Sequence, residues 1–232
     1  DALPEVIVSG ANLLLVAPNL GGLQFGEFEA IWDEPAYPRA CFNSMAWGDV
    51  DADGDLDLYL PAIDQVADAD DQSSWTELQD FAGPGTHDLL FLREGEAWAE
   101  PVPMAAGLDG TPGLSILAFF TDRDADGDLD LFVSSDRPVQ GHPPSAFFRN
   151  DGGSPPSLVN DAAAVGAALR LDGMGLGSND LNGDGVLDYC VSDVGDSLTC
   201  LLSDGDGGWF EGGNAVGLGV AWAAEPDPDT GD

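Results

Sequence analysis

The segment Asp49-Val-Asp51-Ala-Asp53-Gly54-Asp-Leu-Asp57 is the part of this 232-residue chain that decides its fold. It places a carboxylate at positions 1, 3, 5 and 9 of nine residues, with Gly at position 6. Residues 122–130 (DRDADGDLD) and 180–188 (DLNGDGVLD) repeat the pattern in the same register, with one amide among the acids. Surface turns rich in Asp and Gly are the alternative interpretation. Three copies in one register favour a common, specific structure instead.

Carboxylates at alternate positions of a loop that Gly bends sharply are expected to converge on one point. Without a cation they would repel one another, so the pattern predicts a site for a hard cation. Calcium fits best, because it accepts six to eight oxygen ligands at about 2.3 to 2.6 Å in flexible geometry, whereas magnesium requires a tighter octahedron. A backbone carbonyl at position 7 would add a ligand. We therefore expect about three calcium ions. The predicted ligands are Asp49, Asp51, Asp53, Asp55 and Asp57; Asp122, Asp124, Asp126, Asp128 and Asp130; and Asp180, Asn182, Asp184, Val186 and Asp188.

The residues that follow each loop favour strands over the helix of an EF-hand. An EF-hand requires a bidentate Glu at position 12, whereas that position is Leu60, Val133 and Val191 here. The runs that leave the loops are LYL, LFV and YCV, which are short and rich in strand-forming residues. The loops begin 73 and then 58 residues apart. That spacing fits one supersecondary unit per loop.

Each loop lies within the same expected order of strands. The strands that enter the loops are predicted at residues 44–47, 114–120 and 174–177. A third strand follows each apolar run, at residues 88–92, 146–149 and 198–202. A weaker fourth segment leads to Gly-Leu motifs at residues 106–108 and 216–218. Three or four short antiparallel strands per repeat, without helical periodicity, predict an all-β chain of β-propeller-like blades.

On these segments the chain resembles a known family. FNSMAWGDVDADGDLDLYL (42–60), LSILAFFTDRDADGDLDLFV (114–133) and GMGLGSNDLNGDGVLDYCV (173–191) are similar to the FG-GAP or VCBS repeats of integrin-type β-propellers and of many secreted bacterial proteins. The resemblance covers nearly the whole chain. It implies that loop positions 1, 3, 5, 7 and 9 bind calcium in all three repeats. Asn182 in place of Asp lowers the charge of the third site without removing an oxygen.

We expect about three full repeats, with partial blades at both termini. The expected units are residues 1–41 (partial blade and linker), 42–108, 109–168 and 169–218 (one calcium loop each), and 219–232 (partial blade or acidic tail). Residues 1–9 align with 184–192, and residues 227–232 match the front half of a loop. The ends would then meet within one chain in a ring of about four blades, or between chains in rings or filaments, or belong to a longer propeller. Because an unpaired edge strand is a template for strand addition, self-association through these partial blades is expected.

The charge of the chain limits its partners and its compartment. The net charge is −37, and three calcium ions would reduce its magnitude only to 31 (37 minus 6). Such a chain repels nucleic acid and anionic membranes, and no apolar run is long enough to cross a bilayer. Loops of this kind bind calcium at about 0.1 to 1 mM in extracellular modules. We therefore expect a secreted or cell-surface protein, whose start at Asp1 is a processed N-terminus.

Neither the histidines nor the cysteines indicate catalysis. His87 and His142 lie in Gly- and Pro-rich connections, and no Ser or Cys occupies a recognisable nucleophile motif. Cys190 and Cys200 lie on consecutive expected strands, where they either form a disulfide or remain two buried thiols. Cys41 is unpaired in both cases. We expect no enzymatic activity.

The sequence thus predicts a secreted, calcium-stabilised β-propeller repeat protein with a structural, adhesive or self-assembling role, filament formation included. The alternative is a carbohydrate- or protein-binding propeller module that accompanies a separate catalytic domain. The long insertion at residues 63–86, which carries Trp75 and Phe81, is the candidate recognition loop for a protein or glycan ligand. A solvated connector is the other interpretation of that insertion.

Overall fold

The computed structural model describes residues 4–10, 13–34, 40–64, 87–95, 97–104, 113–135, 143–193 and 198–212. Every regular element in these ranges is a β-strand, which confirms the predicted all-β class. These ranges contain no helix that is long and apolar enough to cross a membrane.

Three four-stranded antiparallel sheets each contain one of the acidic loops. Sheet 1 consists of β7 (Ala46–Gly48), β8 (Asp57–Leu60), β10 (Asp88–Phe91) and β13 (Val102–Met104). Sheet 2 consists of β14 (Ser115–Thr121), β15 (Asp130–Ser135), β16 (Ala146–Asn150) and β17 (Leu158–Asn160). Sheet 3 consists of β18 (Gly173–Asn179), β19 (Asp188–Asp193), β20 (Leu198–Ser203) and β21 (Trp209–Glu211). In every sheet the strands pair in chain order, and the acidic loop joins the first strand to the second.

The remaining strands form one further sheet and three small pairs. The N-terminal sheet consists of β1 (Val6–Gly10), β2 (Leu13–Ala17) and β5 (Glu29–Asp33). The pairs are β3 (Asn19–Gly21) with β4 (Gln24–Phe25), β6 (Ala40–Phe42) with β9 (Ala62–Asp64), and β11 (Arg93–Glu94) with β12 (Ala97–Trp98).

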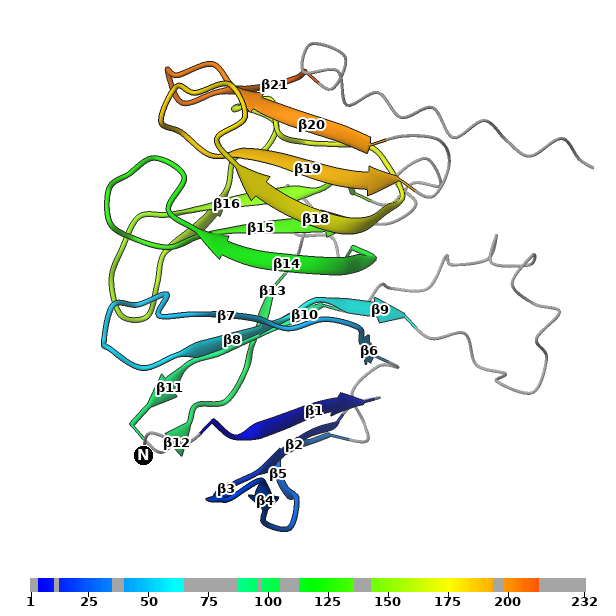
Figure 1. Cartoon of the computed structure of the whole chain (residues 1–232), viewed down its shortest axis with the longest axis vertical. Helices are drawn as coiled ribbons and strands as arrows, with labels where there is room; N and C mark the ends of the chain where they lie inside the picture. The colour runs from blue at the N-terminus through cyan, green and yellow to red at the C-terminus, as the bar shows by residue number, and fades with distance from the viewer. Residues whose placement is uncertain are drawn as a thin grey trace, which may run out of the picture.

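The four sheets follow one another as layers along the long axis of the molecule, from the N-terminal sheet to sheet 3 (Figure 1). The three acidic connections, β7 to β8, β14 to β15 and β18 to β19, lie on the same side of this stack, at the left of the view. The described ranges form an open series of sheets and contain no closed ring. The predicted antiparallel sheets are therefore present, while their arrangement as the blades of a propeller remains a prediction.

An apolar cluster fills each space between successive sheets, which explains why three consecutive apolar residues follow the first acid of each second strand. Leu58 and Leu60 of β8 face the N-terminal sheet, whereas Tyr59 between them faces sheet 2. In β15, Leu131 packs toward sheet 1 and Phe132 toward sheet 3. Because successive strand residues point to opposite faces, a strand segment that packs against an apolar cluster on each face is apolar at consecutive positions.

The predicted strands are found with shifts of at most two residues at their ends. Each sheet has a fourth strand, β13, β17 or β21, and β13 and β21 end before the Gly-Leu motifs at 106–108 and 216–218 to which the fourth segments were expected to lead. The candidate recognition loop falls mainly on residues 65–86, which lie outside the described residues. His142, the motifs at 106–108 and 216–218, and the tail at 219–232 lie outside them too.

A buried acid also contributes to the packing of sheet 1. Asp88, at the start of β10, is 1% exposed. Its Oδ2 accepts the hydroxyl of Tyr59 at 2.5 Å, and its Oδ1 accepts the backbone N–H of Ala62 at 2.8 Å. Burial raises the pKa of Asp88 to about 7, against the opposing effect of these hydrogen bonds. The folded chain therefore retains a proton on Asp88 that the unfolded chain loses near pH 4.

This difference predicts a pH dependence with a definite sign. Because the folded-state pKa lies above the unfolded one, the free energy of unfolding should fall as pH rises from about 4 to about 7 and be insensitive to Asp88 above that. Asp88→Asn, which cannot ionise, should show a weaker fall. Urea denaturation of both proteins across this range, in the presence of a chelator, measures the difference. Parallel profiles for the parent and Asp88→Asn would contradict the assignment.

Candidate metal centre

The three acidic loops share one backbone conformation. Position 4 has a positive φ in each, 58° at Ala52, 59° at Ala125 and 79° at Gly183. Position 6 is Gly in each, with φ of 98° at Gly54, 98° at Gly127 and 88° at Gly185. A side chain is strained at such angles, so Gly is required at position 6, while Ala tolerates the left-handed region at position 4. The repeated sequence pattern therefore encodes a repeated turn.

The carboxylate at position 1 accepts hydrogen bonds from backbone N–H groups later in its own loop. Asp49 accepts the backbone N–H groups of Asp53 and Gly54, both at 3.0 Å. Asp180 makes the equivalent bonds in the third loop, and Asp122 accepts the N–H of Gly127 at 3.2 Å in the second. The acid at position 5 accepts the N–H of position 7 in all three loops. These hydrogen bonds within each loop contribute to its shape.

The carboxylate at position 9 has a different role, because its hydrogen bonds connect the loop to the rest of the sheet. Asp130 is fully buried, and its Oδ2 accepts the N–H of Arg123 at 3.0 Å while its Oδ1 accepts that of Asn150 at 2.8 Å. Asp57 accepts the N–H groups of Val50 and Arg93 in the same way, both at 2.9 Å. Each of these acids thus joins position 2 of its own loop to a residue at the end of the third strand of its sheet, Asn150 in β16, or two residues beyond it, Arg93 after β10.

The third loop repeats this arrangement. Asp188 is also fully buried, and it accepts the N–H groups of Leu181 at 2.6 Å and Ser203 at 2.7 Å. Sequence reasoning described position 9 only as a metal ligand and missed this role. The available signal was its place as the first residue of a strand buried on both faces, where a carboxylate must find donors.

The first loop brings three carboxylates together. One oxygen each from Asp49, Asp51 and Asp57 lies within 4.8 Å of the others, so this group could hold a metal ion. Asp51 Oδ2 accepts the hydroxyl of Ser154 at 2.8 Å, whereas its buried Oδ1 has no hydrogen-bond partner among the described residues. A buried carboxylate oxygen without a donor is costly. A cation bound between this oxygen of Asp51 and the carboxylates of Asp49 and Asp57 would remove that cost, so the donor set fits a hard ion.

Electrostatics in this group point the same way. Burial raises the pKa of Asp57, and the negative charges of Asp51 and Asp53 raise it further, against two backbone hydrogen bonds. In the second loop, burial raises the pKa of Asp130 to about 6 and also raises that of Asp124, with a smaller contribution from Asp126. Carboxylates whose ionised form is disfavoured in this way are stabilised by an added cation.

The second loop gathers a different set of acids. Asp122, Asp124 and Asp126 place oxygens within 4.8 Å of one another and could also hold a metal ion, but all three are exposed. Asp130 at position 9 lies outside this group. It lies instead 3.7 Å from Nε of Arg123, a buried side chain that also pairs with Asp161 at 2.7 Å.

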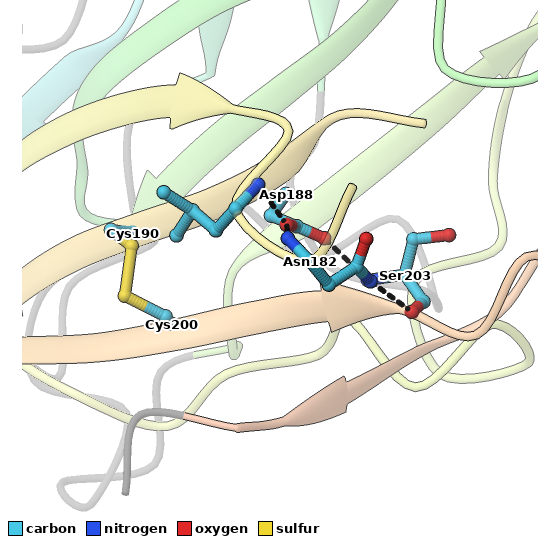
Figure 2. The surroundings of a disulfide bond; sticks show 6 residues. Asn182, Asp188, Cys190, Cys200 and Ser203 are labelled. Carbon is cyan, nitrogen blue, oxygen red and sulfur yellow. Dashed lines mark hydrogen bonds between the residues drawn. A yellow bond between two sulfur atoms is a disulfide. The ribbon is translucent and has the colours of Figure 1, made fainter. Parts of the chain in front are cut away.

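The third loop differs from the other two. Within the described ranges, its acids Asp180, Asp184 and Asp188 do not form a group of three converging carboxylates. Asn182 donates from Nδ2 to the backbone oxygen of Ser203 at 2.9 Å and to Asp184 at 3.0 Å. Figure 2 shows Asn182, Asp188 and Ser203 beside the strand pair β19 and β20. The Asn182 side chain thus donates hydrogen bonds within the protein, at the loop position where the other two loops carry a carboxylate.

The same strand pair is joined by a disulfide between Cys190 and Cys200 (Figure 2). The two residues lie directly opposite each other in the ladder, with 4.0 Å between their Cα atoms. The structure therefore selects the disulfide over the two free thiols that the sequence left as an alternative.

The other predicted ligands stay predictions. Asp53 and Asp184 at position 5 are exposed, and each accepts a backbone N–H of its own loop. The side chain of Asp55 accepts the N–H of Gly95 at 2.6 Å. Nothing in the structure tests the position-7 carbonyls as ligands; these are the backbone oxygens of Asp55, Asp128 and Val186.

A scan against models of known protein families finds no match for this chain, and a search of curated proteins finds none that is significantly similar. The resemblance to FG-GAP and VCBS repeats therefore rests on the three quoted segments alone.

The role of position 9 as a backbone tie predicts a loss of stability that needs no metal. Asp188→Ala would leave the N–H groups of Leu181 and Ser203 without their acceptor, at a cost of about 3 kcal/mol in the free energy of unfolding. The third loop suits this test because its acids do not converge. Asp184→Ala, in the same loop but exposed, is the matched control and should cost less than about 1 kcal/mol. Urea denaturation with a chelator present measures the free energy of unfolding of both variants. Equal losses for the two variants would contradict the role of Asp188 in connecting the loop to the sheet.

Proposed function

We propose that this protein is a calcium-stabilised β-repeat protein with a structural or adhesive role outside the cell. The observation that carries the proposal is the first acidic group, in which Asp49, Asp51 and Asp57 converge and one buried oxygen of Asp51 lacks a donor. The second acidic group supports it as a further cation site. Calcium is preferred to magnesium because converging carboxylates of a flexible loop suit its larger and more variable coordination shell.

The place of the first group in the fold indicates what the ion would do. The loop touches sheet 2 at two points, since Ser154 donates to Asp51 and Asn150 Nδ2 donates to the backbone oxygen of Val50 at 2.7 Å. Val50 itself is 2% exposed and packs in the apolar cluster between sheets 1 and 2. A cation in this loop would therefore stabilise the contact between two successive sheets. Its binding energy would add to the stability of the folded state.

Three features support an extracellular site of action. Calcium loops of this type are filled at the millimolar concentrations found outside cells. The Cys190–Cys200 disulfide suits an oxidising compartment, in which such bonds persist. The high negative charge of the chain is compatible with a medium rich in divalent cations.

Calcium should raise the stability of the parent protein and lose that effect when Asp51 is neutralised. For a dissociation constant of about 0.1 to 1 mM, about 10 mM calcium should add about 1.4 to 2.7 kcal/mol to the free energy of unfolding. Asp51→Asn should abolish most of this gain. Thermal and urea denaturation with calcium, with an equal concentration of magnesium and with chelator measure the effect.

Glu211→Gln is the matched control, because it removes the same charge at an exposed position of β21. It should retain the full response to calcium. The proposal fails if Asp51→Asn and Glu211→Gln respond to calcium equally, or if the parent does not respond.

An adhesive or self-assembling role has support from the hairpin of β3 and β4. Leu20, Leu23, Phe25 and Phe28 in and beside this hairpin are 64%, 94%, 45% and 52% exposed. The hairpin projects from the N-terminal end of the stack (Figure 1). Groups of exposed apolar side chains on soluble proteins often mark interaction surfaces. We therefore propose that this hairpin mediates contacts with another protein molecule, a second copy included.

Leu23→Asp tests the assembly role, because a side chain that is 94% exposed contributes little to folding. The parent should show a concentration-dependent mass above that of its 24.0 kDa chain by light scattering, and Leu23→Asp should remain monomeric. Val159→Asp, at a partly exposed apolar site on β17, is the control and should assemble like the parent. A parent that stays monomeric at all concentrations, with and without calcium, would rule out self-assembly.

A further inference from the structure

The second acidic loop carries a basic residue where the other two loops carry an apolar one. Position 2 is Arg123 in the second loop, Val50 in the first and Leu181 in the third. The chain contains only six basic residues among 43 acidic ones, so a basic residue inside an acidic loop is unusual in this sequence. The side chain of Arg123 is 3% exposed, which places its charge inside the protein rather than in solvent.

The guanidinium of Arg123 is held in one place by acids and rings. Its Nη2 lies 2.7 Å from Oδ2 of Asp161, and its Nε lies 3.7 Å from Oδ2 of Asp130. Its central carbon lies 4.5 Å from the centre of the Phe147 ring of sheet 2 and 5.9 Å from that of Trp209 of sheet 3. Such contacts fix a desolvated guanidinium strongly, and Arg keeps its charge at any physiological pH.

The first and second acidic groups differ in their members. The fixed charge of Arg123 would produce this difference. The first and second loops carry five carboxylates each at the same positions. In the first loop the position-9 acid, Asp57, belongs to the converging group. In the second loop the equivalent acid, Asp130, pairs with Arg123 and is absent from the group, whose three members are exposed.

We propose that Arg123 is a built-in counter-ion of the second loop, which lowers the affinity of that loop for calcium below that of the first. The inference rests on the proposed calcium-binding function. A unit positive charge beside the acids repels an incoming divalent cation and already neutralises part of their mutual repulsion. The second loop therefore depends on calcium less than the first does, and it keeps sheets 2 and 3 together through its own guanidinium.

Two double variants measure the two loops separately without altering Arg123. Asp51→Asn with Asp180→Asn leaves the second loop intact, and Asp124→Asn with Asp180→Asn leaves the first intact. Calorimetric titration with calcium chloride should show binding to the first loop about 3 to 10 times tighter than to the second. Absence of binding to the first loop would refute the proposed function itself. Equal affinities, or a tighter second loop, would refute only the role of Arg123.

Substitution of Arg123 then tests its charge directly. In the Asp51→Asn and Asp180→Asn background, Arg123→Gln should lower the calcium dissociation constant of the second loop about 3- to 10-fold. Arg123→Lys, which keeps the charge, should leave the constant near its original value. Arg170→Gln removes the same charge at an exposed position before β18 and serves as the control, with no change expected.

The melting temperature of Arg123→Gln gives a second readout. Calcium should raise it more than it raises the melting temperature of the background protein, because the ion then replaces the missing guanidinium charge. An unchanged dissociation constant, or a calcium response no larger than that of the background protein, would overturn the inference.

Discussion

The buried carboxylate at the ninth position of each acidic loop is the constraint on which the described fold depends. Asp57, Asp130 and Asp188 are each fully buried, and each accepts backbone N–H groups from position 2 of its loop and from a residue at or just beyond the end of the third strand. A carboxylate can accept about four hydrogen bonds, and a buried one requires donors. By placing an acid there, the sequence fixes the loop, the second strand and the third strand relative to one another.

The layered arrangement follows from the hydrogen bonds of the position-9 acids together with the apolar residues of the second strands. Because the acid sits at the loop end of the second strand, the rest of that strand is free to be apolar on both faces, as Leu58, Tyr59 and Leu60 are. Each sheet then packs against the sheet before it and the sheet after it. Position 2 of the first two loops reaches the following layer, through Val50 in the cluster with sheet 2 and Arg123 over the Trp209 ring of sheet 3. The acidic loops thus serve the contacts between sheets as well as the turns within them.

Much of the fold could be predicted from the sequence, since the physical signals were local. Glycines at position 6, acids at alternate positions and short apolar runs indicated strand, turn and strand in three places, and all three are present. The partnership of Cys190 and Cys200 was also visible from strand register, although only the structure decided between disulfide and thiols. Closure of the sheets into a ring could not be decided from these local signals, because closure depends on contacts between segments far apart in the chain.

The candidate site was harder to predict than the turns. The spacing of the acids suggested three equal calcium sites, yet the described residues show three different environments. Ser154, which contacts Asp51 from 103 residues away, and Asp161, which pairs with Arg123, belong to no motif near the loops they affect. The position-9 acid looked like one more ligand because one of its backbone donors comes from a distant part of the chain, at or beyond the third strand. These long-range partners make the first and second loops different. Ser154 contacts an acid of the converging group in the first loop, whereas Asp161 holds the buried positive charge of Arg123 in the second.

The most direct test of the account is a crystal structure grown with millimolar calcium, with the ion located by its anomalous scattering. The account predicts an anomalous peak in the first loop, about 2.3 to 2.6 Å from carboxylate oxygens of Asp49, Asp51 and Asp57. It also predicts that Asp57 keeps its bonds to the backbone N–H groups of Val50 and Arg93. A first loop that shows no peak, with Asp51 turned away from its neighbours, would contradict the central claim.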